Sequence, residues 1–220
     1  MDTTLEARLV SVPAGTVTLE GDLRVPEGSR GIVLFAHGSG SSRKSPRNRY
    51  VAQALREVGL ATLLIDLLTA DEEAVDLRTG RLRFDVDLLA GRLVGATDWL
   101  GKNPETRGLK IGYFGASTGA GAALVAATER PQAVGAIVSR GGRPDLAGPA
   151  LPRVQAPTLL IVGGNDTPVI RMNQEALAQL RVEAKLEIVP GATHLFEEPG
   201  ALEVVARLAG EWFRRHLTPA

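Results

Sequence analysis

The chain has 220 residues, of which 44% are hydrophobic and 23% charged, a composition typical of a folded globular protein. Its 25 basic residues balance 25 acidic ones, so the chain has no net positive charge to attract nucleic acid. We therefore predict that it does not bind nucleic acid. The absence of cysteine excludes disulfides, thiolate zinc sites and a cysteine nucleophile.

The length favours one domain, which we expect to span residues 1–220. No apolar run is long enough to cross a membrane, and the opening MDTTLEARLV lacks the basic start and apolar core of an export signal. We therefore predict a cytoplasmic protein that does not bind membranes.

In chain order, residues 7–25 predict two antiparallel strands, and short β-branched runs predict buried strands after them. These strands are expected at 31–36, 60–66, 110–114, 134–138 and 157–162, with a last strand at 185–189. Helical spacing of apolar residues predicts helices at 48–58, 82–100, 118–129, 171–181 and 199–216. Residues 67–80 are expected to form the longest irregular loop, with the DEEAVD run exposed to solvent.

Alternating strands and helices predict an α/β fold: a mostly parallel sheet of about eight strands with helices on both faces.

A candidate nucleophile follows the strand that ends at Phe114. The segment Gly115-Ala116-Ser117-Thr118-Gly119 has the pattern G-x-S-x-G between a predicted strand and a predicted helix. Glycines on both sides permit a sharp turn that holds a serine hydroxyl above the sheet. The alternative is a glycine-rich turn that only packs the helix closely against the sheet. We predict that Ser117 is the nucleophile.

A serine nucleophile needs a base, and the chain has three histidines. His194 lies in a loop between the last predicted strand and the final helix, from which its ring can reach the nucleophile. His216 is expected on an exposed helical face, and His37 ends a strand beside two glycines. We predict that His194 is the base rather than a histidine that caps its loop.

A carboxylate must orient the base, and Asp166 follows the strand at 157–162 in the turn Gly163-Gly164-Asn165. The chain order Ser117, Asp166, His194 is the order that this fold requires. Asp66 and Asp145 also follow strands, but they are less suitably placed, and the alternative for Asp166 is an ordinary surface turn.

The negative oxygen formed by attack on a carbonyl needs backbone N–H donors. One is expected from Thr118, at the start of a helix. We expect the other from the loop after the strand at 31–36, with the Ser39 amide preferred and the Gly38 amide second. The His37 ring is then structural.

Segments FAHGSGSS (35–42), GYFGASTGAG (112–121), LLIVGGNDTPV (159–169) and VPGATHLFEEPG (189–200) resemble the α/β-hydrolase superfamily, and most closely its small dienelactone-hydrolase-like branch. The resemblance implies acyl-ester hydrolysis through an acyl-enzyme, without a metal or organic cofactor. Enzymes named for dienelactone use cysteine where this chain has Ser117, which favours a general carboxylesterase. Only residues 140–156 separate two strands where many relatives insert a lid, so we expect no lid domain, an open site and small ester substrates.

Arginines in two loops near the predicted site suggest recognition of an anionic substrate group. We predict that Arg43 or Arg140 binds it, because a guanidinium fits a carboxylate or phosphate. The alternative is that these arginines pair with carboxylates such as Asp66 or Asp145. Thioesterase, lactonase, amidase and acyltransferase activities fit the same residues, as does, less well, a non-catalytic binding protein.

Overall fold

The computed structural model describes residues 7–218, and its centre is one eight-stranded sheet. In spatial order the strands are β1 (Arg8–Ala14), β2 (Val17–Arg24), β4 (Ala61–Ile65), β3 (Gly31–Ala36), β5 (Lys110–Ala116), β6 (Val134–Arg140), β7 (Thr158–Gly163) and β8 (Ala184–Val189). Strand β2 runs antiparallel to β1 and β4, and the remaining pairs are parallel. The predicted fold is confirmed, whereas the prediction of one domain over residues 1–220 stays a prediction.

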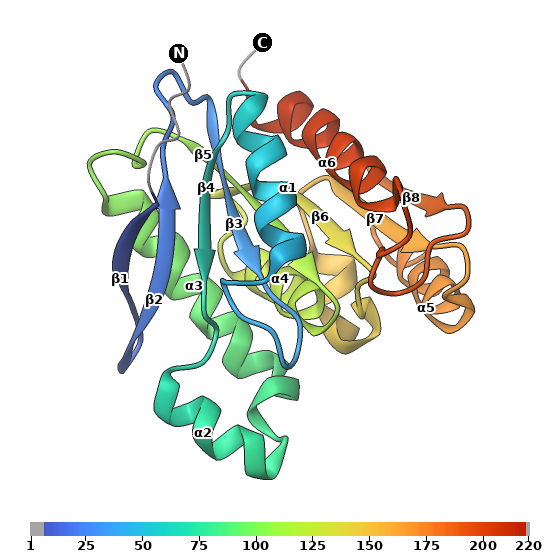
Figure 1. The fold of residues 1–220 in the computed structure, drawn as a ribbon, viewed down its shortest axis with the longest axis horizontal. Coiled ribbons are helices and arrows are strands. Elements are labelled where there is room, and N and C mark those ends of the chain that lie inside the picture. The colour runs from blue at the N-terminus through green and yellow to red at the C-terminus, as the bar shows by residue number, and fades with distance from the viewer. Residues whose placement is uncertain (1–6, 219–220) are drawn as a thin grey trace.

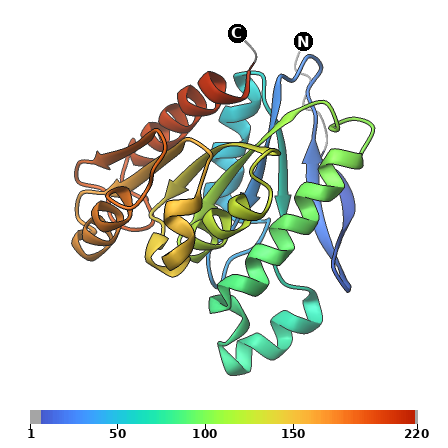
Figure 2. The same ribbon diagram turned by 180° about the vertical axis from the view of Figure 1, so that it is seen from behind.

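Helices cover both faces of the sheet. Helices α1 (Pro46–Glu57) and α6 (Ala201–Leu217) lie on the face that is in front in Figure 1. Figure 2 shows the other face, with α3 (Val86–Lys102), α4 (Thr118–Glu129) and α5 (Thr167–Leu177). Each face has its own cluster of buried side chains, one packed under α1 and α6 and the other under α3, α4 and α5.

The central strands carry continuous apolar runs because both faces of the sheet are covered. All residues of β3, β4 and β7 are buried. Strands β3 to β8 run parallel to one another, so their carboxyl ends lie at the same edge of the sheet. The loops that follow β3, β5, β6, β7 and β8 therefore lie at one edge of the sheet.

The prediction of an irregular loop over residues 67–80 is wrong. Residues Ala70–Thr79 form helix α2, followed by the short 3-10 helix η1 (Leu82–Phe84). Thr69 and Glu72 cap the start of α2 reciprocally, and Gly80 ends it with a left-handed backbone. The helix buries only Asp76, so it has no apolar stripe to reveal it. In Figure 1, α2 projects beyond the carboxyl ends of β3 and β4.

The segment between β6 and β7 contains only the 3-10 segment η2 (Pro144–Arg153), which is packed against α4 and α5, and no lid domain is inserted there. Between residues 7 and 218, no helix has the length and apolar character needed to span a bilayer.

Candidate active site

Ser117 stands on a strained turn between β5 and α4. Its φ of 50° and ψ of −122° define a backbone conformation that residues other than glycine rarely adopt. A Cβ on Gly115 would lie 2.4 Å from Ala120 Cα, and one on Gly119 would lie 2.4 Å from Ala36 O. The sequence therefore needs both glycines to present Ser117 at the carboxyl edge of the sheet.

Asp166 and His194 come together from two neighbouring loops. His194 Nδ1 lies 2.7 Å from Asp166 Oδ2. The two loops approach so closely that only glycine fits at position 163, where a Cβ would lie 2.4 Å from Ala192 O. The Asn165 backbone N–H also donates to Ala192 O at 2.9 Å. The Asp166 side chain is only 13% exposed, so water screens its interaction with the ring weakly.

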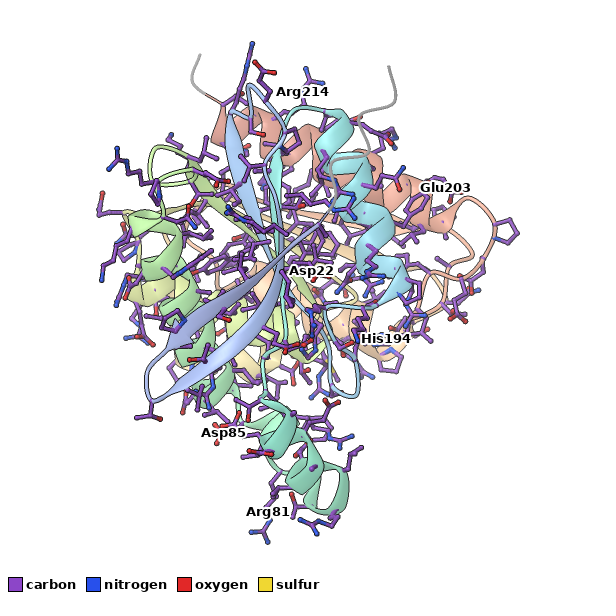
Figure 3. The ribbon with its side chains drawn as sticks, turned by 60° about the vertical axis from the view of Figure 1, so that its left-hand side comes forward. Asp22, Arg81, Asp85, His194, Glu203 and Arg214 are labelled. Atoms are coloured by element: carbon purple, nitrogen blue, oxygen red, sulfur yellow. The ribbon has the colours of Figure 1, made fainter. Side chains whose placement is uncertain are left out.

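The turn after β6 links Ser117 to His194. The Ser117 N–H donates to Arg140 O at 3.3 Å, and a Cβ on Gly141 would lie 3.5 Å from His194 Nδ1. Figure 3 shows His194 at the edge of the sheet beyond which the segment with Arg81 and Asp85 projects. Among the hydrogen bonds of residues 7–218, none joins Ser117 Oγ to the His194 ring. Active sites without substrate often lack this bond, which tightens when the substrate binds.

The loop after β3 approaches Ser117 closely. Its geometry favours the Gly38 amide over the Ser39 amide, whereas the sequence analysis preferred Ser39. The Ser39 N–H donates to Thr118 Oγ1 at 2.9 Å, so it is already engaged. The Gly38 position lies closer to the nucleophile, since a Cβ there would be 3.1 Å from Ser117 Cβ. The Thr118 N–H begins α4 and lies at its positive end. The Gly38 and Thr118 amides are thus the better candidates for binding an oxyanion.

His37 fixes this loop to the rest of the site. Its Nε2 accepts from the Leu67 N–H at 3.0 Å, and its Nδ1 donates to Gly38 O at 2.9 Å. Burial lowers the pKa of His37, although the Gly38 carbonyl and nearby carboxylates oppose the effect. A neutral ring satisfies both bonds, which is the structural role predicted for it.

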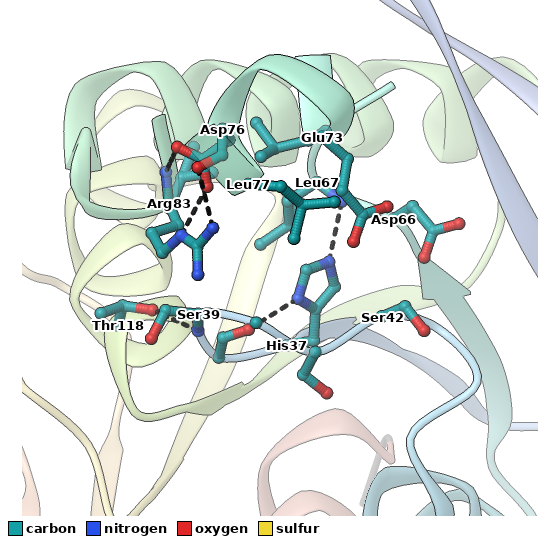
Figure 4. Close-up of a pocket in the computed structure, with 15 residues that line it drawn as sticks. His37, Ser39, Ser42, Asp66, Leu67, Glu73, Asp76, Leu77, Arg83 and Thr118 are labelled. Carbon is teal, nitrogen blue, oxygen red and sulfur yellow. Dashed lines mark hydrogen bonds and ion pairs between the residues drawn. The ribbon is translucent and has the colours of Figure 1, made fainter. Parts of the chain in front are cut away.

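A cavity of about 80 Å³ opens beside the oxyanion candidates (Figure 4). Ser39 and Thr118 line one side of it, and Leu77 and Arg83 from α2 and η1 line the other. The sequence analysis did not identify Arg83. This residue lies at the start of the helix predicted over 82–100, and no motif there distinguishes it from the other arginines. Burial of Asp76 alone would raise the pKa of its carboxyl, but hydrogen bonds from Arg83 and Leu82 outweigh it and lower that pKa. Asp76 thereby holds η1 and Arg83 against α2.

The two predicted substrate arginines have different surroundings. Arg43 pairs with Asp66, Glu20 and Asp22, the alternative recognised in the sequence. Arg140 is buried, and no residue between 7 and 218 accepts a hydrogen bond from its side chain.

Comparisons with known proteins identify the family of this chain. The model of the Dienelactone hydrolase family matches residues 20–216. This chain belongs to the dienelactone hydrolase family. A crystal structure of a dienelactone hydrolase from Anabaena variabilis is 68% identical, with a TM-score of 0.95 over 96% of this chain and 98% of that one. The lidless α/β serine hydrolase XC6422 of Xanthomonas campestris shares the fold at 19% identity, with a TM-score of 0.77 over 98% of this chain and 97% of that one.

One curated relative has a different name. "Putative phosphoribosyl transferase Rv0571c" of Mycobacterium tuberculosis is 59% identical over 216 residues. These residues are 98% of this chain but 48% of that protein. The chain thus spans about half the length of that relative.

Proposed function

We propose that this protein is a serine hydrolase that cleaves small carboxylic esters through an acyl-enzyme. The observation that carries the proposal is the 2.7 Å contact between His194 Nδ1 and Asp166 Oδ2, next to a serine held with φ at 50°. A carboxylate in contact with one ring nitrogen leaves the other free to accept a proton.

In the acylation step, Ser117 Oγ attacks the ester carbonyl carbon while His194 Nε2 takes the hydroxyl proton. The carbonyl oxygen becomes negative, and the Thr118 and Gly38 N–H groups stabilise it. The C–O bond to the alcohol then breaks, and His194 returns its proton to the leaving oxygen. The Asp166 carboxylate stabilises the ring while it is charged.

In deacylation, His194 takes a proton from water, and the resulting hydroxide attacks the acyl carbon of the ester on Ser117. The same two amides stabilise the second negative oxygen. The Ser117 Oγ–acyl bond breaks, His194 returns the proton to Oγ, and the carboxylic acid leaves. The two steps together consume one ester and one water, and the chain returns to its starting protonation state.

Two features favour small substrates. The cavity beside Ser39 and Thr118 holds about 80 Å³, whereas pockets for drug-sized ligands measure roughly 300–1,000 Å³. The short η2 segment also provides no apolar cover for a long acyl chain. Thioesters and lactones pass through the same intermediates and remain alternative substrates.

The transferase name of the mycobacterial relative belongs to a protein about twice as long as this chain. The part shared with this chain is matched by a hydrolase family, and the groups around Ser117 suit acyl transfer to water. This favours hydrolysis over phosphoribosyl transfer for the chain itself.

The experiment is hydrolysis of p-nitrophenyl acetate and butyrate at pH 8 by the wild type and by Ser117→Ala. We expect the substitution to remove nearly all activity, because the nucleophile is lost. Ser139→Ala is the matched control, since Ser139 lies near the carboxyl end of the neighbouring strand β6 but is buried on the α4 side of the sheet. Equal rates for the wild type and Ser117→Ala would contradict the proposal.

A further inference from the structure

A second cavity lies outside the candidate active site, between helix α1 and strands β2 and β4. This α1–β2 cavity has a volume of about 240 Å³, and Ser117, Asp166 and His194 lie outside its lining. The polar residues that line it are Asp22, Arg24, Arg49, Gln53, Arg56 and Thr62. Three of these six side chains are guanidinium groups, which suit the recognition of an anion.

The three arginines reach the cavity from a helix and from the sheet. Arg49 and Arg56 are seven residues apart, which is close to two helical turns, so they lie on the same side of α1. Arg24 on β2 pairs with Thr62 on β4. Leu64, which shares a face of β4 with Thr62, packs in the apolar cluster under α1. In Figure 1, β2 lies to the left of α1, beside the helix rather than beneath it.

Two of these arginines have no carboxylate partner between residues 7 and 218. Arg56 Nη1 donates to Thr62 Oγ1, a neutral acceptor, at 3.0 Å. Within the same range, no acceptor binds the Nε or Nη2 of Arg56 or any donor of the Arg24 side chain. Burial, and then the charge of Arg24, lower the pKa of Arg56 to about 10, while Glu57 opposes the effect. Arg56 therefore stays charged at neutral pH, half-buried and without an ion pair.

The carboxylate that lines the cavity, that of Asp22, is already shared by two other arginines. Arg43 Nε and Arg49 Nη2 each lie 3.4 Å from one of its oxygens. Arg49 uses one donor in this contact, and its side chain is 56% exposed, so its other donors can turn toward a ligand. The positive charges around the cavity thus exceed the negative ones, which favours an anionic ligand.

We propose that the α1–β2 cavity binds the phosphate group of a small phosphorylated compound through Arg24, Arg49 and Arg56. A phosphate monoester carries a charge of about −1.5 to −2 at neutral pH, which matches two arginines without ion pairs. Its three terminal oxygens can accept from guanidinium groups on different sides, whereas a carboxylate offers two oxygens in one plane. The volume of about 240 Å³ lies below the roughly 300–1,000 Å³ of pockets for drug-sized ligands, so a small organic group suits it.

This phosphate site is separate from the catalytic centre. Strands β4 and β3 lie between β2 and β5, and Ser117 follows the end of β5. Arg24 pairs with Thr62 near the start of β4, whereas the loops of the candidate active site follow the carboxyl ends of the strands. A ligand that binds here stabilises the folded chain by mass action and takes no part in ester cleavage. Phosphate binding is therefore independent of the proposed esterase function.

The test is calorimetric titration of inorganic phosphate and of glycerol 3-phosphate into the wild type at constant ionic strength, with succinate as the carboxylate for comparison. We expect a Kd of about 1 mM or below for the phosphates, and binding of succinate that is weaker by about tenfold or more. Arg56→Gln and Arg24→Gln each weaken phosphate binding at least about tenfold, as the loss of a charge-assisted hydrogen bond does. Arg207→Gln, which removes the same charge from the exposed side of α6, is the matched control and keeps the wild-type Kd. Ser117→Ala also keeps it, because the site is separate from the nucleophile.

Asp22→Asn changes the affinity in the opposite direction. It removes the carboxylate from the cavity and releases Arg49, so phosphate binding tightens. If Arg56→Gln does not fold, Arg24→Gln decides, because its side chain has no partner between residues 7 and 218 to lose. The proposal is overturned by the absence of saturable phosphate binding up to about 10 mM, by a Kd that Arg24→Gln leaves unchanged, or by succinate binding as tightly as phosphate. Loss of binding in Ser117→Ala, or weaker binding in Asp22→Asn, would also overturn it.

Discussion

Asp166→Asn tests the orientation of the base. The Asp166 carboxylate lies 2.7 Å from His194 Nδ1 and is shielded from water, so the substitution removes a charge-assisted hydrogen bond. Such a bond contributes about 1.5–3 kcal/mol, or about ten- to 150-fold in rate. An asparagine NH2 group turned toward the ring would also favour the tautomer that cannot accept the Ser117 proton, and the combined loss in serine proteases is about 10⁴-fold. We expect kcat to fall by a factor of about 10² to 10⁴.

The assay is the initial rate of p-nitrophenyl acetate hydrolysis at pH 8, with circular dichroism and Tm measured on each variant. Asp145→Asn is the matched control, because Asp145 follows the neighbouring strand and pairs with Arg143 at the surface. The control is expected to keep kcat within about threefold of the wild type, as surface ion pairs contribute little. A folded Asp166→Asn variant that retains more than about a tenth of the wild-type kcat would refute the role of Asp166.

Three further predictions concern the loop after β3 and the cavity. Gly38→Ala places a Cβ 3.1 Å from Ser117 Cβ and is expected to displace the loop and lower kcat by about tenfold or more; an unchanged kcat would contradict a close, fixed approach of this loop to Ser117. Because burial lowers the pKa of His37 below 6.5, the unfolded chain binds more protons, so the free energy of unfolding falls as pH decreases through 6.5. Urea titrations at pH 7.5 and 5.5 check this, and His37→Gln should reduce the difference. Acetyl and butyryl esters should have a higher kcat/KM than octanoyl esters, and equal values would contradict a small substrate site.

The fold was predictable where burial dictates the residue type. Strands β3 and β7 are apolar throughout because helices cover both of their faces, and α4 follows the serine turn at the predicted residues. Helix α2 was not predicted because it projects from the sheet and buries one acidic residue, Asp76. The sequence does contain the Thr69–Glu72 capping pattern of a helix start. No apolar stripe follows it, however, and the charged DEEAVD run favours an exposed loop.

The sequence predicts which loops form the candidate site, but it does not predict all the side-chain contacts within it. Strand order at the carboxyl edge determines that Asp166 and His194 meet, so their position in the chain was enough. The engagement of the Ser39 amide depends on the direction of the Thr118 side chain, which the sequence does not specify. The same holds for the arginines: Arg43 finds three carboxylates from β2 and the end of β4, whereas Arg140 finds none.

The most direct test of the account is to react the protein with a fluorophosphonate and to map the adduct by mass spectrometry. Attack on phosphorus requires an activated serine, and the leaving fluoride is replaced by the serine oxygen. The account predicts one adduct, on the peptide that contains Ser117, and its loss in Ser117→Ala and strong slowing in His194→Gln. An unlabelled wild type, or an adduct that persists in Ser117→Ala, would contradict a serine hydrolase centred on Ser117.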